Sequence, residues 1–196
     1  MMEQRHLKHN NKGYTLVEMI ITMAIIVVLS GLALVTISMI NSAKAREASV
    51  KLTSELSDMY TKSKNQMVVI KDNATGDNVK YPKYSYCMML YYSGNNCYIK
   101  KGYYNPEGTD EATKYIFVDS ENVNDGKGTS LSSRVTIKYT DKTGSTFTIE
   151  DDEKVYILFD RTGRCIEGVG EYSFYKKNGN VIANVQLKTN GSYQTD

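Results

Sequence analysis

Residues 14–43 read YTLVEMIITMAIIVVLSGLALVTISMINSA, and this stretch decides the fold of the amino-terminal part of the chain. No charged side chain occurs from Met19 to Ala43, and most of the residues there are apolar. With a helical rise of ~1.5 Å per residue, this uncharged run would extend roughly 37 Å. The hydrocarbon core of a bilayer is about 30 Å thick, so the stretch predicts a membrane-spanning helix.

The thirteen residues before this stretch, MMEQRHLKHNNKG, are polar and basic. Their Arg5, Lys8 and Lys12 outweigh Glu3, and this excess equals the formal net charge of +2 of the 196-residue chain. Basic residues beside a spanning helix stay in the cytoplasm, so the remainder of the chain is expected outside the membrane. That remainder is formally neutral, which excludes a strongly basic nucleic-acid-binding protein by bulk charge.

The junction of these two segments carries a processing motif. A basic leader ends in Gly13, an aromatic residue follows at Tyr14, and Thr-Leu-Val-Glu leads into the apolar helix. This junction resembles the cleavage site of type IV prepilins and pseudopilins. The resemblance implies that a prepilin peptidase cuts after Gly13 and methylates the new amino terminus at Tyr14. Phe or Met is commoner at the position of Tyr14 in that family, and here the aromatic character is kept.

Glu18 is the one charged residue near the start of the apolar run. A carboxylate at the membrane end of a helix is costly unless it has a partner or a shallow position. Cleavage after Gly13 would create a partner, the ammonium group of Tyr14. We expect the Tyr14 amine of one subunit to neutralise Glu18 of a neighbour and to set the register between parallel helices. The alternative is that Glu18 lies among the headgroups around a single-pass anchor.

From Lys44 onward the helical pattern becomes amphipathic, and neither Gly nor Pro interrupts residues 32–75. We therefore expect one helix from about Tyr14 to about Lys64, whose second half packs against a head domain. The predicted segments are a leader at residues 1–13, a hydrophobic transmembrane and filament-core helix at residues 14–43, and a globular head at residues 44–196 that begins with the amphipathic helix 44–64. Small or apolar residues recur at steps of three and four along that helix: Ala45, Ala48, Leu52, Leu56, Met59 and Ser63.

Beyond residue 76 the sequence changes to short strand-like runs separated by turn residues. Arg134–Tyr139 alternates between polar and apolar side chains, as a half-buried antiparallel strand does. Asp160–Gly163 and Lys177–Asn180 are predicted hairpin turns. The fold class is therefore predicted to be α+β, a long N-terminal helix packed on an antiparallel sheet. The predicted strands are Tyr86–Tyr92, Lys114–Val118, Arg134–Tyr139, Thr146–Ile149, Lys154–Phe159, Cys165–Gly168 and Val181–Leu187.

The chain has three cysteines, and a translocated domain can form disulfides. Cys87 and Cys97 would close a small loop around residues 93–96, and this pair is the predicted disulfide. The alternatives are that Cys165 pairs with one of them, or that no disulfide forms.

Tyrosine is concentrated within residues 81–104. As ordinary strand residues these side chains would cover the sheet, which is the favoured interpretation. The alternatives are an adhesive surface and a stacking surface for single-stranded DNA, to which neighbouring lysines would add positive charge. The candidate ligand surface consists of Tyr91, Tyr92, Tyr98, Lys100 and Lys101.

No catalytic set emerges from the sequence. Both histidines, His6 and His9, lie in the predicted leader, so the processed chain would lack a Ser-His or Cys-His pair. The three cysteines lack the paired spacing of a metal site. The acidic run Glu150–Glu153 is expected to be a solvated turn and not a calcium loop. We expect neither enzymatic activity nor a metal or cofactor.

The prepilin resemblance implies a structural subunit of a type IV pilus or a related pseudopilus, assembled through its N-terminal helix. The expected partners are other pilin subunits, the prepilin peptidase, the inner-membrane assembly platform and, before assembly, the membrane. The protein would first be a single-pass membrane protein and then part of an extracellular filament, or fimbrium. The alternative function is a minor pilin whose head acts as an adhesin or a DNA-uptake module, with nucleic acid as a less favoured partner.

Overall fold

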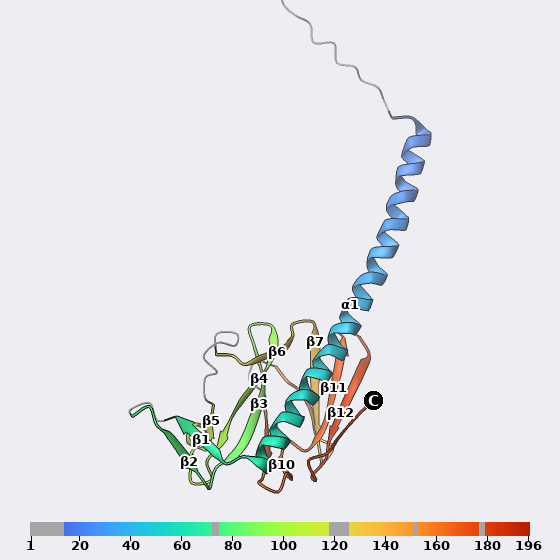
Figure 1. Ribbon diagram of the computed structural model, residues 1–196. Coiled ribbons are helices and arrows are strands. Elements are labelled where there is room, and N and C mark those ends of the chain that lie inside the picture. The colour runs from blue at the N-terminus through green and yellow to red at the C-terminus, as the bar shows by residue number, and fades with distance from the viewer. Residues whose placement is uncertain (1–13, 72–74, 118–125, 151–152, 177–178) are drawn as a thin grey trace, which may run out of the picture. The chain divides into compact units, whose positions relative to one another are not determined.

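The computed structural model describes residues 14–71, 75–117, 126–150, 153–176 and 179–196 (Figure 1). The predicted leader, with Gly13, lies outside these residues. The chain divides into two compact units, Met1–Met39 and Ile40–Asp196. The second unit, called the head below, contains all the strands.

Helix α1 (Leu16–Asn65) contributes to both units. It begins two residues after the predicted start and ends one residue after the predicted end. Lys62 and Lys64 lie in its last turn, where cations interact favourably with the negative end of the helix dipole. Its buried residues recur at helical steps as predicted, and they are Ala45, Ala48, Ser49, Leu52, Leu56, Met59 and Ser63.

The head contains two larger sheets and one separate hairpin, and the strand pairings among the described residues are antiparallel. The hairpin joins β1 (Val68–Lys71) to β2 (Asn78–Tyr81). The six-stranded sheet has the order β10 (Cys165–Glu167), β9 (Lys154–Phe159), β3 (Ser85–Ser93), β4 (Asn96–Tyr104) and β5 (Tyr115–Ile116), with β6 (Thr129–Ser132) also paired to β4. The five-stranded sheet has the order β13 (Tyr193–Thr195), β12 (Val181–Leu187), β11 (Gly170–Lys176), β7 (Val135–Asp141) and β8 (Thr146–Thr148).

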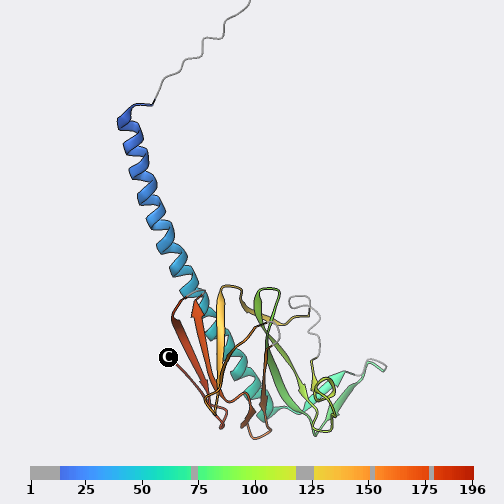
Figure 2. The same cartoon turned by 180° about the vertical axis from the view of Figure 1, so that it is seen from behind.

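One apolar core joins the head portion of α1 to both sheets. Figure 1 shows this part of α1 crossing in front of the sheets, and Figure 2 shows the same elements from behind. Leu52 from α1, Phe159 from β9 and Phe174 from β11 are completely buried in the same cluster. Burial of each such side chain stabilises the fold by about 1.5–3 kcal/mol. The predicted α+β architecture is therefore confirmed.

The predicted strand Lys114–Val118 is wrong at its start. Lys114 ends a one-turn helix, α2 (Glu111–Lys114), because Asp110 caps that helix. The Asp110 carboxylate accepts a hydrogen bond from the Thr113 N–H at 2.8 Å, as in a capping box. The strand that follows is the short β5, and Val118 lies outside the described residues.

The other six predicted strands correspond to β3, β7, β8, β9, β10 and β12 to within two residues at each end. The predicted turn Asp160–Gly163 is also confirmed, because the Gly163 N–H donates to the Asp160 carbonyl at 3.0 Å. Gly163 has a φ of 83°, a conformation that glycine adopts without steric cost. The second predicted turn, Lys177–Asn180, includes residues outside the described part of the chain.

Candidate functional site

The first turn of α1 holds reciprocal hydrogen bonds between Thr15 and Glu18. The Glu18 carboxylate accepts from the Thr15 backbone N–H at 2.9 Å and from the Thr15 hydroxyl at 3.0 Å. In return, the Glu18 N–H donates to the Thr15 hydroxyl oxygen at 3.3 Å. This capping box satisfies N–H groups that have no partner within the helix. Glu18 therefore caps its own helix, a role distinct from the predicted pairing with Tyr14.

The segment that follows presents apolar side chains on all sides. Every residue from 14 to 40 is exposed, and Leu16 and Val27 reach 76% and 71% exposure. Its hydroxyl groups are satisfied by the helix itself, since Thr22, Ser30 and Thr36 each donate to a backbone carbonyl three or four residues earlier, at 2.7–3.0 Å. Among the described residues, α1 is the one helix long and apolar enough to cross a membrane. Its surface suits a bilayer or a bundle of similar helices.

The five residues of the predicted ligand surface do not form one surface. Neighbouring residues of a strand point to opposite faces, and β3 and β4 pair Tyr91 with Tyr98. Tyr91, Tyr98 and Lys100 therefore share one face of the six-stranded sheet. Tyr92 packs against the core on the other face, and Lys101 reaches α1 on that side. The prediction of a common ligand surface is wrong because it ignored this alternation.

Aromatic rings on the face away from α1 largely contact one another. The Tyr91 and Tyr98 ring centroids are 5.9 Å apart, and the Tyr115 and Tyr156 rings stack at 4.0 Å. The Tyr91 hydroxyl donates to the Lys127 carbonyl at 2.9 Å. These contacts support the interpretation of the tyrosines as ordinary strand residues that cover the sheet.

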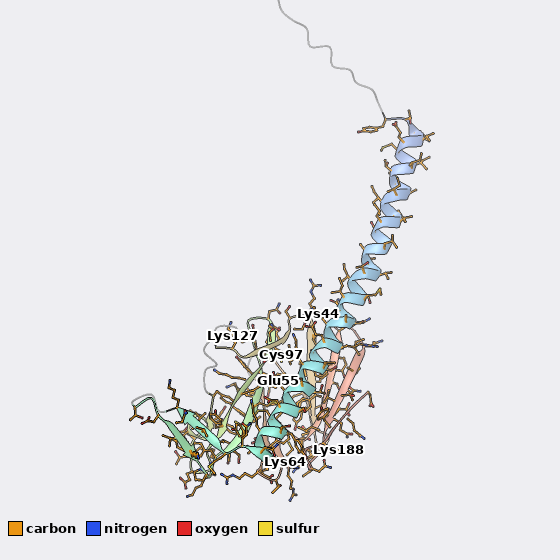
Figure 3. All side chains as sticks on the ribbon, viewed as in Figure 1. Lys44, Glu55, Lys64, Cys97, Lys127 and Lys188 are labelled. Carbon is orange, nitrogen blue, oxygen red and sulfur yellow. The ribbon has the colours of Figure 1, made fainter. Side chains whose placement is uncertain are left out.

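Lys101 joins the six-stranded sheet to α1. Its Nζ lies 2.5 Å from Glu55 Oε2 and 2.8 Å from Asp58 Oδ2. Burial alone would lower the pKa of Lys101, but the hydrogen bonds to Asp58 and Glu55 outweigh it and raise the pKa. Lys62 also contacts Asp58 at 2.9 Å. Lys101 is therefore a structural cation between helix and sheet (Glu55 is labelled in Figure 3).

The predicted Cys87–Cys97 disulfide is also wrong. The strand register places Cys97 opposite Tyr92 and Cys87 opposite Gly102. The two cysteines are thus five positions apart along the ladder, about 17 Å at ~3.4 Å per residue, whereas a disulfide needs Cα atoms within about 7 Å. All three cysteines are free and buried. Burial raises the pKa of the Cys97 thiol to about 12.

The described residues contain no group of three His, Cys, Asp or Glu side chains able to hold a metal ion. In the acidic run, Glu150 and Glu153 are exposed, while Asp151 and Asp152 lie outside the described residues. The residue that sequence reasoning missed in the first turn of α1 is Thr15, the partner of Glu18 in the capping box. Its signal was present, because Thr-x-x-Glu before an apolar run is the sequence pattern of a capping box.

The family model for the prokaryotic N-terminal methylation motif matches residues 8–34. The matched range contains Gly13, Tyr14 and Glu18 together with the start of the exposed apolar helix. No curated protein and no solved structure matches the chain. The chain therefore carries the prepilin-type amino-terminal signature of type IV pilins and pseudopilins, in front of an α+β head.

Proposed function

We propose that this protein is a structural subunit of a type IV pilus or a related pseudopilus, cut after Gly13 by a prepilin peptidase. The observation that carries the proposal is the methylation motif at residues 8–34, which overlaps a helix with exposed apolar side chains. Removing apolar surface from water is favourable by about 25 cal/mol per Å². A bilayer would cover these apolar side chains before assembly, and the helices of neighbouring subunits would cover them in a filament.

The capping box supports a second role for Glu18 in assembly. Cleavage after Gly13 places a new ammonium group on Tyr14, directly before Thr15. The Glu18 carboxylate already accepts two hydrogen bonds from Thr15, which hold it at the start of its own helix. The Tyr14 ammonium of a neighbouring subunit supplies the opposite charge. The pairing then links subunits at a defined axial position.

Processing is tested by mass spectrometry of the protein from cells with and without an active prepilin peptidase. The expected mature chain begins at methylated Tyr14 in the first cells and retains the leader in the second. A Gly13→Leu variant should retain the leader in both, which controls for unrelated proteolysis. A wild-type chain that still begins at Met1 or Met2 beside an active peptidase contradicts the proposal.

Assembly is tested separately with Glu18→Ala and Thr15→Val. Glu18→Ala should be processed normally but remain in the membrane fraction, because the neighbouring amine loses its partner. Thr15→Val keeps the carboxylate and the backbone donor while losing the hydroxyl, so its defect should be smaller. The measurement is the amount of subunit sheared from cells as filament. Normal filament incorporation of Glu18→Ala would count against the pairing with Tyr14.

A further inference from the structure

Residues 105–117, called the strap below, fold over the face of the six-stranded sheet that points away from α1. The strap contains α2 and β5, and its Phe117 ring packs over Gly102 of β4, which has no side chain. A Cβ on Gly102 would lie 2.7 Å from Phe117 Cδ1. The Phe117 ring also reaches Tyr156 of β9, with the two ring centroids 6.2 Å apart. The strap therefore contacts the sheet through aromatic side chains.

The closest of these contacts is between Tyr115 of the strap and Tyr156 of β9. Their ring centroids are 4.0 Å apart and their planes differ by 18°, which is the shortest centroid distance between two aromatic rings in the described part of the chain. Tyr81 and Tyr84 are also stacked, with centroids 4.7 Å apart. That second pair lies within one turn, whereas Tyr115 and Tyr156 come from segments far apart in the sequence.

Both phenols of the Tyr115–Tyr156 pair are hydrogen-bonded to carboxylates. The Tyr115 hydroxyl donates to Glu167 Oε2 of β10 at 2.5 Å, and the Tyr156 hydroxyl donates to Glu111 Oε1 of α2. Burial and these hydrogen bonds raise the pKa of both phenols, so both keep their protons at neutral pH. Each phenol therefore has a base in contact with the proton that it would lose on oxidation.

A carboxylate in this position assists the oxidation of a phenol. Loss of one electron makes the phenol strongly acidic, and the hydrogen-bonded carboxylate receives the proton. The product is a neutral phenoxyl radical, whose unpaired electron lies partly on the two ring carbons beside the C–O carbon. Two such radicals in contact join through these carbons, and each joined carbon then releases its hydrogen as a proton while the ring oxygen takes one up. This step restores both aromatic rings, and the stacked geometry favours it because the rings are already in contact.

We propose that Tyr115 and Tyr156 form an oxidative cross-linking site, at which hydrogen peroxide and a peroxidase join the two rings by one carbon–carbon bond. Two electrons and two protons leave the phenols and reduce one hydrogen peroxide to two water molecules. Both side chains are half-buried, so part of each ring is in contact with solvent. All three cysteines are free, and the new bond would link strap and sheet covalently where no disulfide does. The inference is independent of the proposed pilus function, because both tyrosines belong to one head.

The test oxidises the full chain, in non-ionic detergent micelles, with hydrogen peroxide and a haem peroxidase. Mass spectrometry of the digested protein should find the Tyr115 and Tyr156 peptides joined, with a mass lower than their sum by two hydrogen atoms. In a mixture of unlabelled and ¹⁵N-labelled chains, each joined pair should carry one label, since the bond forms within a chain. The bond closes a loop of about 40 residues, so it should raise the urea midpoint of unfolding by about 1–2 M.

Two tyrosine variants show whether this pair is the site. Tyr156→Phe removes the phenol and keeps the ring, so it should abolish both the joined peptide and the increase in the urea midpoint. Tyr84→Phe is the matched control, because the hydroxyls of the stacked Tyr81 and Tyr84 make no hydrogen bond among the described residues. It should leave the link to Tyr115 at the wild-type yield.

The carboxylates are tested with Glu111→Gln and Glu167→Gln together. Glutamine keeps a hydrogen-bond acceptor at each phenol and removes the base, so the initial linking rate should fall by about 100-fold. The proposal is overturned if the oxidised wild type lacks the joined peptide, if joined pairs carry both labels, or if Tyr84→Phe also loses the link. It is also overturned if oxidation leaves the urea midpoint unchanged. A wild-type linking rate in the double glutamine variant would contradict the role of the carboxylates as proton acceptors.

Discussion

Replacing Lys101 with methionine tests whether this residue anchors the sheet to α1 or belongs to a ligand surface. Methionine keeps an unbranched apolar stem and removes the charge. In the variant, Asp58 retains its contact with Lys62 at 2.9 Å, whereas within the described part of the chain Glu55 retains only the hydrogen bond from the Thr129 hydroxyl at 3.0 Å. The Glu55 side chain is 15% exposed, so its carboxylate becomes the poorly compensated charge.

The expected cost follows from this geometry. Loss of a hydrogen bond between charged groups destabilises a protein by about 1.5–3 kcal/mol. The Lys101 side chain is 38% exposed, and solvent screening places the expected loss near the lower limit, at about 1.5 kcal/mol. With a urea m-value of about 2 kcal/mol/M, the unfolding midpoint should fall by about 0.5–1 M. The assay is urea unfolding of residues 40–196, which contain the whole core cluster.

Glu55→Gln provides the control, because it removes the carboxylate that Lys101→Met leaves uncompensated. In the Glu55→Gln background, Lys101→Met should cost less, with a coupling free energy of about 1 kcal/mol. An unchanged midpoint for Lys101→Met, or an equal cost in both backgrounds, would refute the anchoring role of Lys101.

Three further predictions concern the core and the loops. The Cys97 thiol, whose pKa burial raises to about 12, ionises only at high pH, so it should react with a thiol reagent at about pH 8 only after unfolding in urea. Leu52→Ala should lower the free energy of unfolding by about 2–5 kcal/mol, while Val50→Ala, at a position 65% exposed, should change the urea midpoint little. Gly191→Ala should destabilise the head more than Gly144→Ala, as measured by thermal unfolding. Both residues have positive φ, which costs roughly 1–2 kcal/mol for alanine, but a Cβ on Gly144 has open space and one on Gly191 meets a backbone oxygen at 2.0 Å.

The helix and the processing motif could be predicted from the sequence, because the residues that define each of them are close together along the chain. Helix α1 combines an uncharged apolar run with a second half of helical periodicity, and both patterns depend only on residues within a few turns of each other. The processing motif is also contiguous, since the family model matches the unbroken range of residues 8–34. Strand β4 (Asn96–Tyr104) escaped prediction because Lys100 and Lys101 interrupt its apolar pattern. It is held in the sheet by pairing with β3, β5 and β6 and by burial of its Cys97 and Ile99 in the core.

The errors at the candidate site come from register and pairing. Cys87 and Cys97 are close in sequence, but Gly94 and Asn95 form a two-residue turn, both with positive φ, as in type I′ hairpins. That turn makes Tyr92 the partner of Cys97 and separates the cysteines along the ladder. The partners of Lys101 could not be predicted, because Asp58 lies 43 residues away and meets it only through tertiary packing.

The formal neutrality of the chain beyond the leader describes a sum, whereas binding depends on where the charges lie and what already compensates them. In the head, Glu55 and Asp58 are compensated by Lys101, and Asp160 accepts three hydrogen bonds within its own loop. The charges of the head are thus partly engaged by its own fold, so its formal neutrality does not describe any one of its surfaces.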